Sequence, residues 1–148
     1  MNLLFLRGCV LLLGLLAAPL FSFAQADAVL GTWLNEERDG KILIYKCGDQ
    51  FCGRLVQMNQ SNGPDGKPLL DAKNPDARLR SLPILNSVLM KNFKYAGGNL
   101  WENGTIYDGR AGKTYSCKMT LVTKNQLDVR GFVGFSLIGK TSTWTRVP

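Results

Sequence analysis

Residues 101–115 read W-E-N-G-T-I-Y-D-G-R-A-G-K-T-Y, and this stretch decides the fold. It contains one strand, a turn with Gly109 and Gly112, and the start of a second strand, with aromatic residues on both arms. Glycines in a short connection between two such arms are typical of an antiparallel hairpin. We therefore predict that a β-hairpin forms the centre of the protein.

Strand-like segments continue on both sides of this hairpin. In residues 113–121, apolar Cys117 and Met119 alternate with polar Ser116 and Lys118, which is the pattern of a half-buried strand. Further strands are predicted at residues 29–34, 41–45, 53–56, 84–89, 92–95, 100–107, 126–133 and 138–147. About eight or nine short antiparallel strands, with no linker and no repeat, predict one all-β domain. A sandwich fits this pattern, but closure into an up-and-down barrel removes the exposed edges, so we favour the barrel.

The first 26 residues are predicted to be a signal peptide. Arg7 supplies a positive charge, residues 8–21 are almost wholly apolar, and cleavage fits after Ala24 or Ala26. The apolar run is shorter than the ~20 residues of a membrane-spanning helix, and Pro19 interrupts it. We therefore expect a periplasmic or secreted protein with one domain over residues 27–148 and no transmembrane span.

The 148 residues include no histidine, and the net charge is +7. The lack of histidine excludes Ser-His-Asp and Cys-His catalysis and histidine-ligated zinc. The basic residues form no run, and export argues against nucleic acid as a partner. A small anionic ligand or an anionic envelope surface suits the charge better. We expect no cofactor, and the sequence names no protein partner.

Three cysteines follow the predicted signal peptide. Cys47 and Cys52 flank a predicted turn at Gly48-Asp49, so they face each other at short range. In an oxidising compartment we expect them to form a disulfide, with two free thiols as the alternative. Cys117 alternates with polar neighbours and is expected to be a small buried apolar residue.

Residues 59–75 form the only long irregular segment, and loops of this length in compact domains are often functional. Asn74 as N-cap and Pro75 at the first helical position predict a short helical turn near residues 75–81. The oxygen-bearing side chains of this region lack the spacing of a calcium loop. We therefore expect turn and capping chemistry, and no metal site, at Asp65, Asp71, Asn74 and Asp76.

Two short motifs lie near the ends of the chain. Gly31-Thr32-Trp33 and Thr143-Trp144-Thr145-Arg146 resemble the lipocalin and wider calycin pattern, a G-x-W on the first strand and an Arg on the last. The first and last strands of a closed up-and-down barrel are neighbours, so Arg146 is expected to lie over the Trp33 indole. The alternative is two core tryptophans with a surface arginine.

Further motifs are spread over nearly the whole predicted mature chain: Ile44-Tyr45-x-Cys47, Cys52-Gly53, Leu70-Asp71-x-x-Asn74-Pro75-Asp76, Leu79-Arg80, Trp101-x-x-Gly104-x-Ile106-Tyr107-Asp108, Gly112-Lys113-Thr114-Tyr115, Val129-Arg130-Gly131 and Gly139-x-Thr141-x-Thr143-Trp144-Thr145-Arg146. Together they resemble a bacterial exported family catalogued as domain of unknown function 2147. The resemblance implies a lipocalin-like barrel and no established activity. The sequence departs from this pattern at Gly109, where proline is expected, and at Asn86, where glycine is expected.

We expect the barrel to bind a small molecule. If Trp144 faces inward, strand alternation brings Lys140, Ser142 and Arg146 to the same face. Such a lumen suits a ligand with an apolar body and an acidic head, because buried cations need a partner. The alternative is that these cations face water and Trp144 packs under their stems. The candidate ligand-binding residues are Trp33, Tyr107, Tyr115, Lys140, Ser142, Trp144 and Arg146.

Two other functions remain open. An envelope structural or interaction protein would need no ligand, and its interior could be filled by Phe51, Phe93, Tyr107, Tyr115, Phe132 and Phe135. An enzyme without histidine would need a carboxylate pair, drawn from Asp71, Asp76, Glu102 and Asp108. No spacing demands such a pair, and the acids of residues 35–40 are expected to lie in a solvated turn. We therefore expect no catalytic residues.

Overall fold

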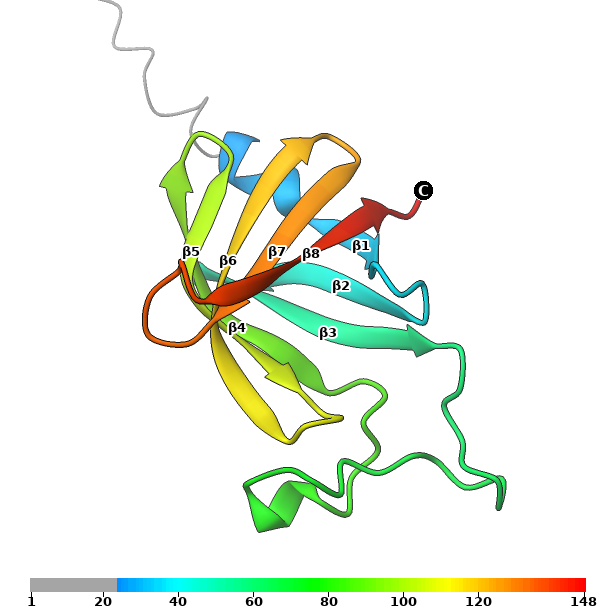
Figure 1. The fold of residues 1–148 in the computed structure, drawn as a ribbon. Coiled ribbons are helices and arrows are strands. Elements are labelled where there is room, and N and C mark those ends of the chain that lie inside the picture. The colour runs from blue at the N-terminus through cyan, green and yellow to red at the C-terminus, as the bar shows by residue number, and fades with distance from the viewer. Residues whose placement is uncertain (1–23) are drawn as a thin grey trace, which may run out of the picture.

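The computed structural model describes residues 24–148, which form a closed antiparallel barrel of eight strands (Figure 1). The strands are β1 (Gly31–Leu34), β2 (Gly40–Cys47), β3 (Gln50–Met58), β4 (Val88–Gly97), β5 (Leu100–Asp108), β6 (Lys113–Thr123), β7 (Gln126–Phe132) and β8 (Gly139–Arg146). Two short 3-10 helices are η1 (Asp27–Val29) and η2 (Ala77–Leu79). The predicted up-and-down barrel is confirmed. The predicted signal peptide falls almost entirely outside the described residues, in which no helix is long and apolar enough to cross a membrane.

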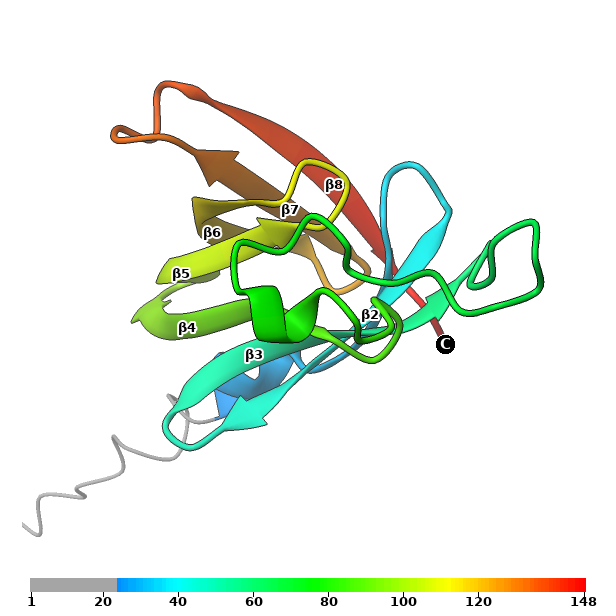
Figure 2. The same ribbon diagram turned by 90° about the horizontal axis from the view of Figure 1, so that it is seen from below.

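The two ends of the barrel differ. The loop end carries the connection of residues 59–87 and the shorter loops 35–39, 109–112 and 133–138. The closed end carries η1 and the tight turns between the other strand pairs. Figure 1 places η1 and the long connection at opposite ends, and Figure 2 views the barrel from the loop end. The loop end is therefore the side from which the barrel interior is reached.

Strand alternation sorts the side chains as the sequence predicts. On β6, Cys117, Met119 and Leu121 are buried in the barrel, while the residues between them are exposed or half-buried. The β5–β6 hairpin turns at residues 109–112, as the central motif predicts. Gly112 has φ +67°, and a Cβ atom there would lie only 2.2 Å from the Lys73 carbonyl oxygen. The close approach of the long loop therefore requires glycine at this position.

Two local predictions are wrong. Residues 84–89 and 92–95 do not form two strands: residues 84–87 belong to the loop, and β4 runs unbroken from Val88 to Gly97. Asn86 and Asn92 both adopt positive φ, at 70° and 65°, which asparagine tolerates better than most residues.

The predicted helix cap is also misplaced. The N-cap of η2 is Asp76, whose side chain accepts a hydrogen bond from the Arg78 amide. The Asn74 side chain instead accepts from the Asp76 amide, in the turn that precedes η2.

The interior near the closed end is filled with side chains. Phe93, Trp101 and Trp33 are completely buried there, and Phe51 packs edge-on to Trp101. The Phe93 ring lies against Gly104 on the neighbouring strand, where a Cβ atom would come within 2.5 Å of three ring carbons. Glycine at position 104 therefore makes room for the ring that closes this half of the lumen.

The barrel closes through a short seam between its first and last strands. Only Trp33↔Arg146 and Leu34↔Thr145 pair across it. The Arg146 guanidinium lies 4.2 Å from the centroid of the Trp33 ring and donates to the carbonyls of Ala28, Leu30 and Lys124. The predicted cation–π contact is therefore present and is combined with three hydrogen bonds.

The cysteines are arranged as predicted. Cys47 and Cys52 form a disulfide across the β2–β3 turn, with their Cα atoms 5.9 Å apart. Cys117 is a free, buried thiol. Burial raises the pKa of the Cys117 thiol to about 12, so this side chain behaves as an apolar core residue.

Candidate functional site

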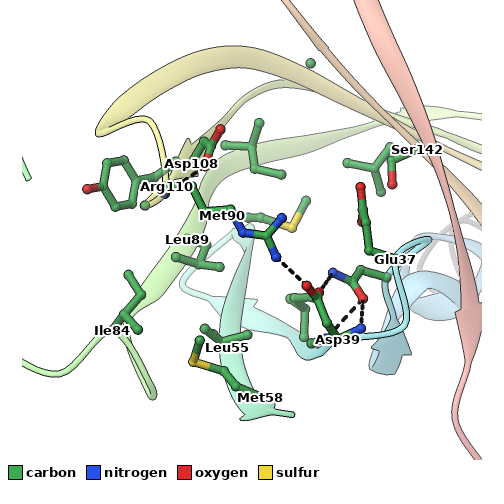
Figure 3. Close-up of a pocket in the computed structure, with 18 of the residues that line it drawn as sticks. Glu37, Asp39, Leu55, Met58, Ile84, Leu89, Met90, Asp108, Arg110 and Ser142 are labelled. Atoms are coloured by element: carbon green, nitrogen blue, oxygen red, sulfur yellow. Dashed lines mark hydrogen bonds and ion pairs between the residues drawn. The ribbon is translucent and has the colours of Figure 1, made fainter. Parts of the chain in front are cut away.

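The loop-end half of the lumen is a cavity of about 850 Å³ (Figure 3). Its wall is mostly apolar, which suits the body of a small organic molecule. The principal apolar wall residues come from six of the strands and from the long loop: Ile42, Leu55, Leu89, Met90, Ile106, Val129 and Trp144 on the strands, and Ile84 on the loop. None of the residues that fill the closed end, such as Phe93 and Trp101, lines this space.

The structure brings together five of the seven residues predicted to bind a ligand. Tyr107, Tyr115, Lys140, Ser142 and Trp144 all line the cavity. The Trp144 indole is buried and donates to the Ser142 hydroxyl at 3.0 Å, so these two side chains form one section of the wall.

The other two predicted residues do not line the cavity. Trp33 and Arg146 lie at the closed end, where they stack on each other and close the seam. Strand alternation correctly places Arg146 on the same face as Trp144, but it does not show how far along the barrel each residue lies.

Most charged side chains around the cavity already have partners. Asp39, Asp71, Asp108 and Arg110 all take part in hydrogen bonds or ion pairs. Within residues 24–148, Glu37 and Lys140 are the two charged lining residues without such a contact. Both residues are exposed: Glu37 lies on the loop of residues 35–39, and Lys140 lies at the loop-end start of strand β8. Lys140 is therefore the free cation of the cavity wall.

An ion pair crosses the mouth of the cavity. Arg110, in the β5–β6 turn, contacts the carboxylate of Asp39, in the β1–β2 loop (Figure 3). Asn35 donates to the other oxygen of Asp39 at 2.7 Å. The Asn35 hydrogen bond and, after it, Arg110 hold the pKa of Asp39 below its usual value against the opposing effect of burial. The prediction that the acids of this turn are simply solvated is therefore wrong for Asp39.

A buried polar cluster anchors the long loop beside the mouth. The Asp71 side chain is 6% exposed, and its two oxygens accept from the Tyr107 hydroxyl at 2.6 Å and from the Asn74 amide at 2.7 Å. Desolvation and, after it, the hydrogen bond to Asp71 raise the pKa of Tyr107 to about 12. Tyr107 therefore stays protonated and donates to Asp71 at any physiological pH.

Other contacts hold the same loop against the barrel. Lys73 donates to the Arg110 carbonyl at 2.7 Å, and the Asp71 amide donates to the Leu82 carbonyl at 2.9 Å. The loop is thus a folded part of the cavity rim. The motif of this loop is visible in the sequence, but the pairing of Asp71 with Tyr107 joins residues 36 positions apart, and no local pattern shows it.

Replacing Tyr107 with Phe should lower the free energy of unfolding by about 2 kcal/mol, because a buried carboxylate then loses a hydrogen-bond donor. Urea denaturation followed by tryptophan fluorescence measures this change. Tyr45→Phe is the matched control, since the Tyr45 hydroxyl has no hydrogen bond within residues 24–148, and it should cost less than about 0.5 kcal/mol. Equal effects of the two substitutions would contradict the anchoring role of Asp71.

The described residues contain no group of three or more acids and cysteines placed to hold a metal ion. The acids of the long loop are used locally: Asp76 caps η2 and pairs with Arg78, and the Asp65 side chain accepts from the Lys67 amide. The arrangement can hold an apolar molecule and present one cation to it.

Comparisons with known proteins agree with this fold. Residues 31–146 match the family described as "Uncharacterized protein conserved in bacteria (DUF2147)". A solved structure from Helicobacter pylori, described as "Protein HP1028 from the human pathogen Helicobacter pylori belongs to the lipocalin family", is similar with a TM-score of 0.70. It shares 20% sequence identity, and the match covers 80% of this chain and 82% of that chain. No curated protein sequence matches this chain.

Proposed function

Since this chain belongs to the DUF2147 family of bacterial proteins and folds as a lipocalin-like barrel, we propose that it binds a small molecule in the loop-end half of its lumen. The ligand has an apolar body and an acidic head. The observation that carries this proposal is the cavity of about 850 Å³, which lies in the range of small-molecule sites.

The cavity distinguishes this proposal from a barrel with a filled core. Phe51 and Phe93 fill the closed end as that alternative requires. Tyr107 and Tyr115 instead line the cavity, and Phe135 is 77% exposed, so they leave the loop-end half open. Small barrels without ligands are usually packed through their whole interior. A half-open lumen with an apolar wall favours ligand binding.

The free cation defines the expected head group. Lys140 lines the cavity and has no ion-pair partner within residues 24–148. An anionic group on the ligand would supply that partner, while the apolar body contacts Ile106, Val129 and Trp144. Binding, and not catalysis, is proposed because the acids Asp39, Asp71 and Asp108 are already committed to structural contacts.

We further propose that the protein acts outside the cytoplasm. The predicted signal peptide supports export, and the Cys47–Cys52 disulfide is compatible with an oxidising compartment such as the periplasm.

Gly131→Leu should abolish ligand binding and leave the fold intact. Gly131 lines the cavity, and a Cβ atom there would make only ordinary contacts, at 3.6 Å from Ile106 and 3.8 Å from Tyr115. A leucine side chain therefore extends into the empty space and occupies the site of the ligand body. Native mass spectrometry of protein purified without refolding should show a bound mass on the wild type and none on the variant, with matching circular dichroism spectra. A wild-type protein that carries no bound mass would contradict the proposed function if it also fails to bind the fluorescent probes.

Two fluorescent probes distinguish the contribution of the ligand's acidic head to binding from that of its apolar body. Anilinonaphthalene sulfonate carries an acidic group, whereas N-phenylnaphthylamine has a similar aromatic body without one. Lys140→Gln should weaken binding of the sulfonate probe roughly threefold to fivefold and leave binding of the neutral probe unchanged, because only the sulfonate pairs with the cation. Glu37→Gln is the control and should weaken the binding of neither probe. Failure of the wild type to bind either probe, together with a bare native mass, would contradict the proposed function.

A further inference from the structure

The loop between β7 and β8 exposes an unusual amount of apolar surface. Val133, Phe135, Leu137 and Ile138 are 65%, 77%, 90% and 67% exposed. They are the four most exposed large apolar residues of the described chain and follow one another within six positions. Seen from the loop end, the loop projects to one side of the barrel (Figure 2). Contiguous apolar surface of this kind marks a contact with another partner and not with water alone.

The loop is held in this exposed conformation. The Arg130 guanidinium donates to the carbonyls of Ser136 at 2.6 Å and Leu137 at 3.3 Å. Within the loop, the Val133 amide donates to the Ile138 carbonyl and the Ile138 amide to the Phe135 carbonyl. Several of the loop's backbone polar groups are therefore satisfied internally. Hydrocarbon offers such groups no partner, so this is a condition for inserting an irregular loop into the edge of a bilayer.

The charges around the loop indicate which partner fits. Residues 131–139 carry no charge, and the cations Arg130 and Lys140 flank them on each side. The whole segment of residues 109–148, which forms β6, β7, β8 and their loops, contains seven Lys or Arg residues and one acid, Asp128. This segment therefore carries most of the net charge of +7, but Lys124 and Arg146 lie at the closed end and Arg110 is paired with Asp39, so the cations next to the apolar loop are Arg130 and Lys140. A second copy of the chain docked through the same loop would bring two such pairs of cations together, whereas an anionic lipid surface attracts them.

We propose that residues 133–138 dock the protein on an anionic lipid bilayer. Phe135 and Leu137 enter the boundary between head groups and acyl chains, and the flanking cations Arg130 and Lys140 lie near the anionic head groups. The mouth of the cavity then lies beside the bilayer surface. This proposal goes beyond ligand binding, and it stands or falls without any ligand in the cavity.

Vesicle flotation tests the docking surface. Protein purified after export, with its N-terminus defined by intact mass, should float with phosphatidylcholine vesicles that contain phosphatidylglycerol, and added salt should weaken the binding. The double variant F135S/L137S should lose about a hundredfold in partitioning, because two large apolar side chains no longer leave water. Val122→Ser is the matched control. Val122 is 49% exposed near the closed end of β6, on the same basic strands, and its replacement should leave partitioning unchanged.

Other outcomes overturn the proposal. A wild-type protein that stays with the aqueous fraction at low salt would do so, as would F135S/L137S binding vesicles as tightly as the wild type. Sedimentation velocity adds a further test: a wild-type dimer that F135S/L137S converts to monomers would assign the loop to a second copy of the chain. Matching thermal unfolding of the wild type and the variant shows that the exposed loop, and not the fold, has changed.

Discussion

Gly104→Val should destabilise the barrel by about 3 kcal/mol or more. The Phe93 ring occupies the place of the missing side chain, and even a Cβ atom would lie 2.5 Å from three of its carbons. Phe93 is fully buried, so its ring cannot move aside without disturbing the closed-end core around Trp101. Urea unfolding followed by circular dichroism measures the loss.

A double-mutant cycle identifies the cause. Phe93→Ala alone should cost about 3–5 kcal/mol through the cavity it leaves. The double variant Phe93→Ala/Gly104→Val should lose clearly less stability than the sum of the two single losses, because the valine enters the space that the ring has vacated. Gly131→Ala is the control for adding a side chain to a barrel glycine, since a Cβ atom there meets nothing closer than 3.6 Å. Strict additivity of the two substitutions would contradict the steric explanation.

Arg146→Lys should lower the free energy of unfolding by about 2–3 kcal/mol, although the charge is kept. The guanidinium donates to three carbonyls, at 2.6 Å to Leu30 and Lys124 and at 2.7 Å to Ala28, while it stacks on the Trp33 ring. An ammonium group on a flexible stem cannot reproduce this planar arrangement. The thermal midpoint and the urea midpoint should both fall.

Arg54→Lys is the control for this second prediction. Arg54 also lies over an aromatic ring, at 5.8 Å from the Tyr45 centroid, but it makes a single hydrogen bond, to the Asn86 carbonyl. Its replacement on the barrel exterior should cost less than about 0.5 kcal/mol. If the two arginine substitutions have the same effect, the role of Arg146 in closing the barrel is wrong.

The strands and the closure of this barrel are predictable because they leave periodic or local signals. Alternation on β6 predicts which residues face inward, and the glycines of the hairpins predict where the strands turn. The G-x-W motif and the last arginine even predict the contact between Trp33 and Arg146, because closure makes the first and last strands neighbours.

The candidate site is less predictable because loops and volumes decide it. Arg110 meets Asp39 across 71 positions of sequence, through two loops whose course no periodic pattern describes. Whether the lumen is filled depends on how far each ring reaches. Phe93 closes one half by lying on Gly104, while Phe135, predicted as a filler, lies in a loop that Arg130 holds away from the core.

The short seam between β1 and β8 also bears on the order in which the barrel folds. Every other ladder joins strands that follow one another in the chain, so each can form as a hairpin or a meander with a moderate loss of chain entropy. Contacts such as that between Arg146 and Leu30 span 116 residues, and only two residue pairs of backbone ladder accompany them. We therefore expect a curved, open sheet to form first and its two edges to meet last. Until Arg146 reaches Trp33, both edge strands are free to pair with another chain, which makes the last step of folding the one most exposed to aggregation.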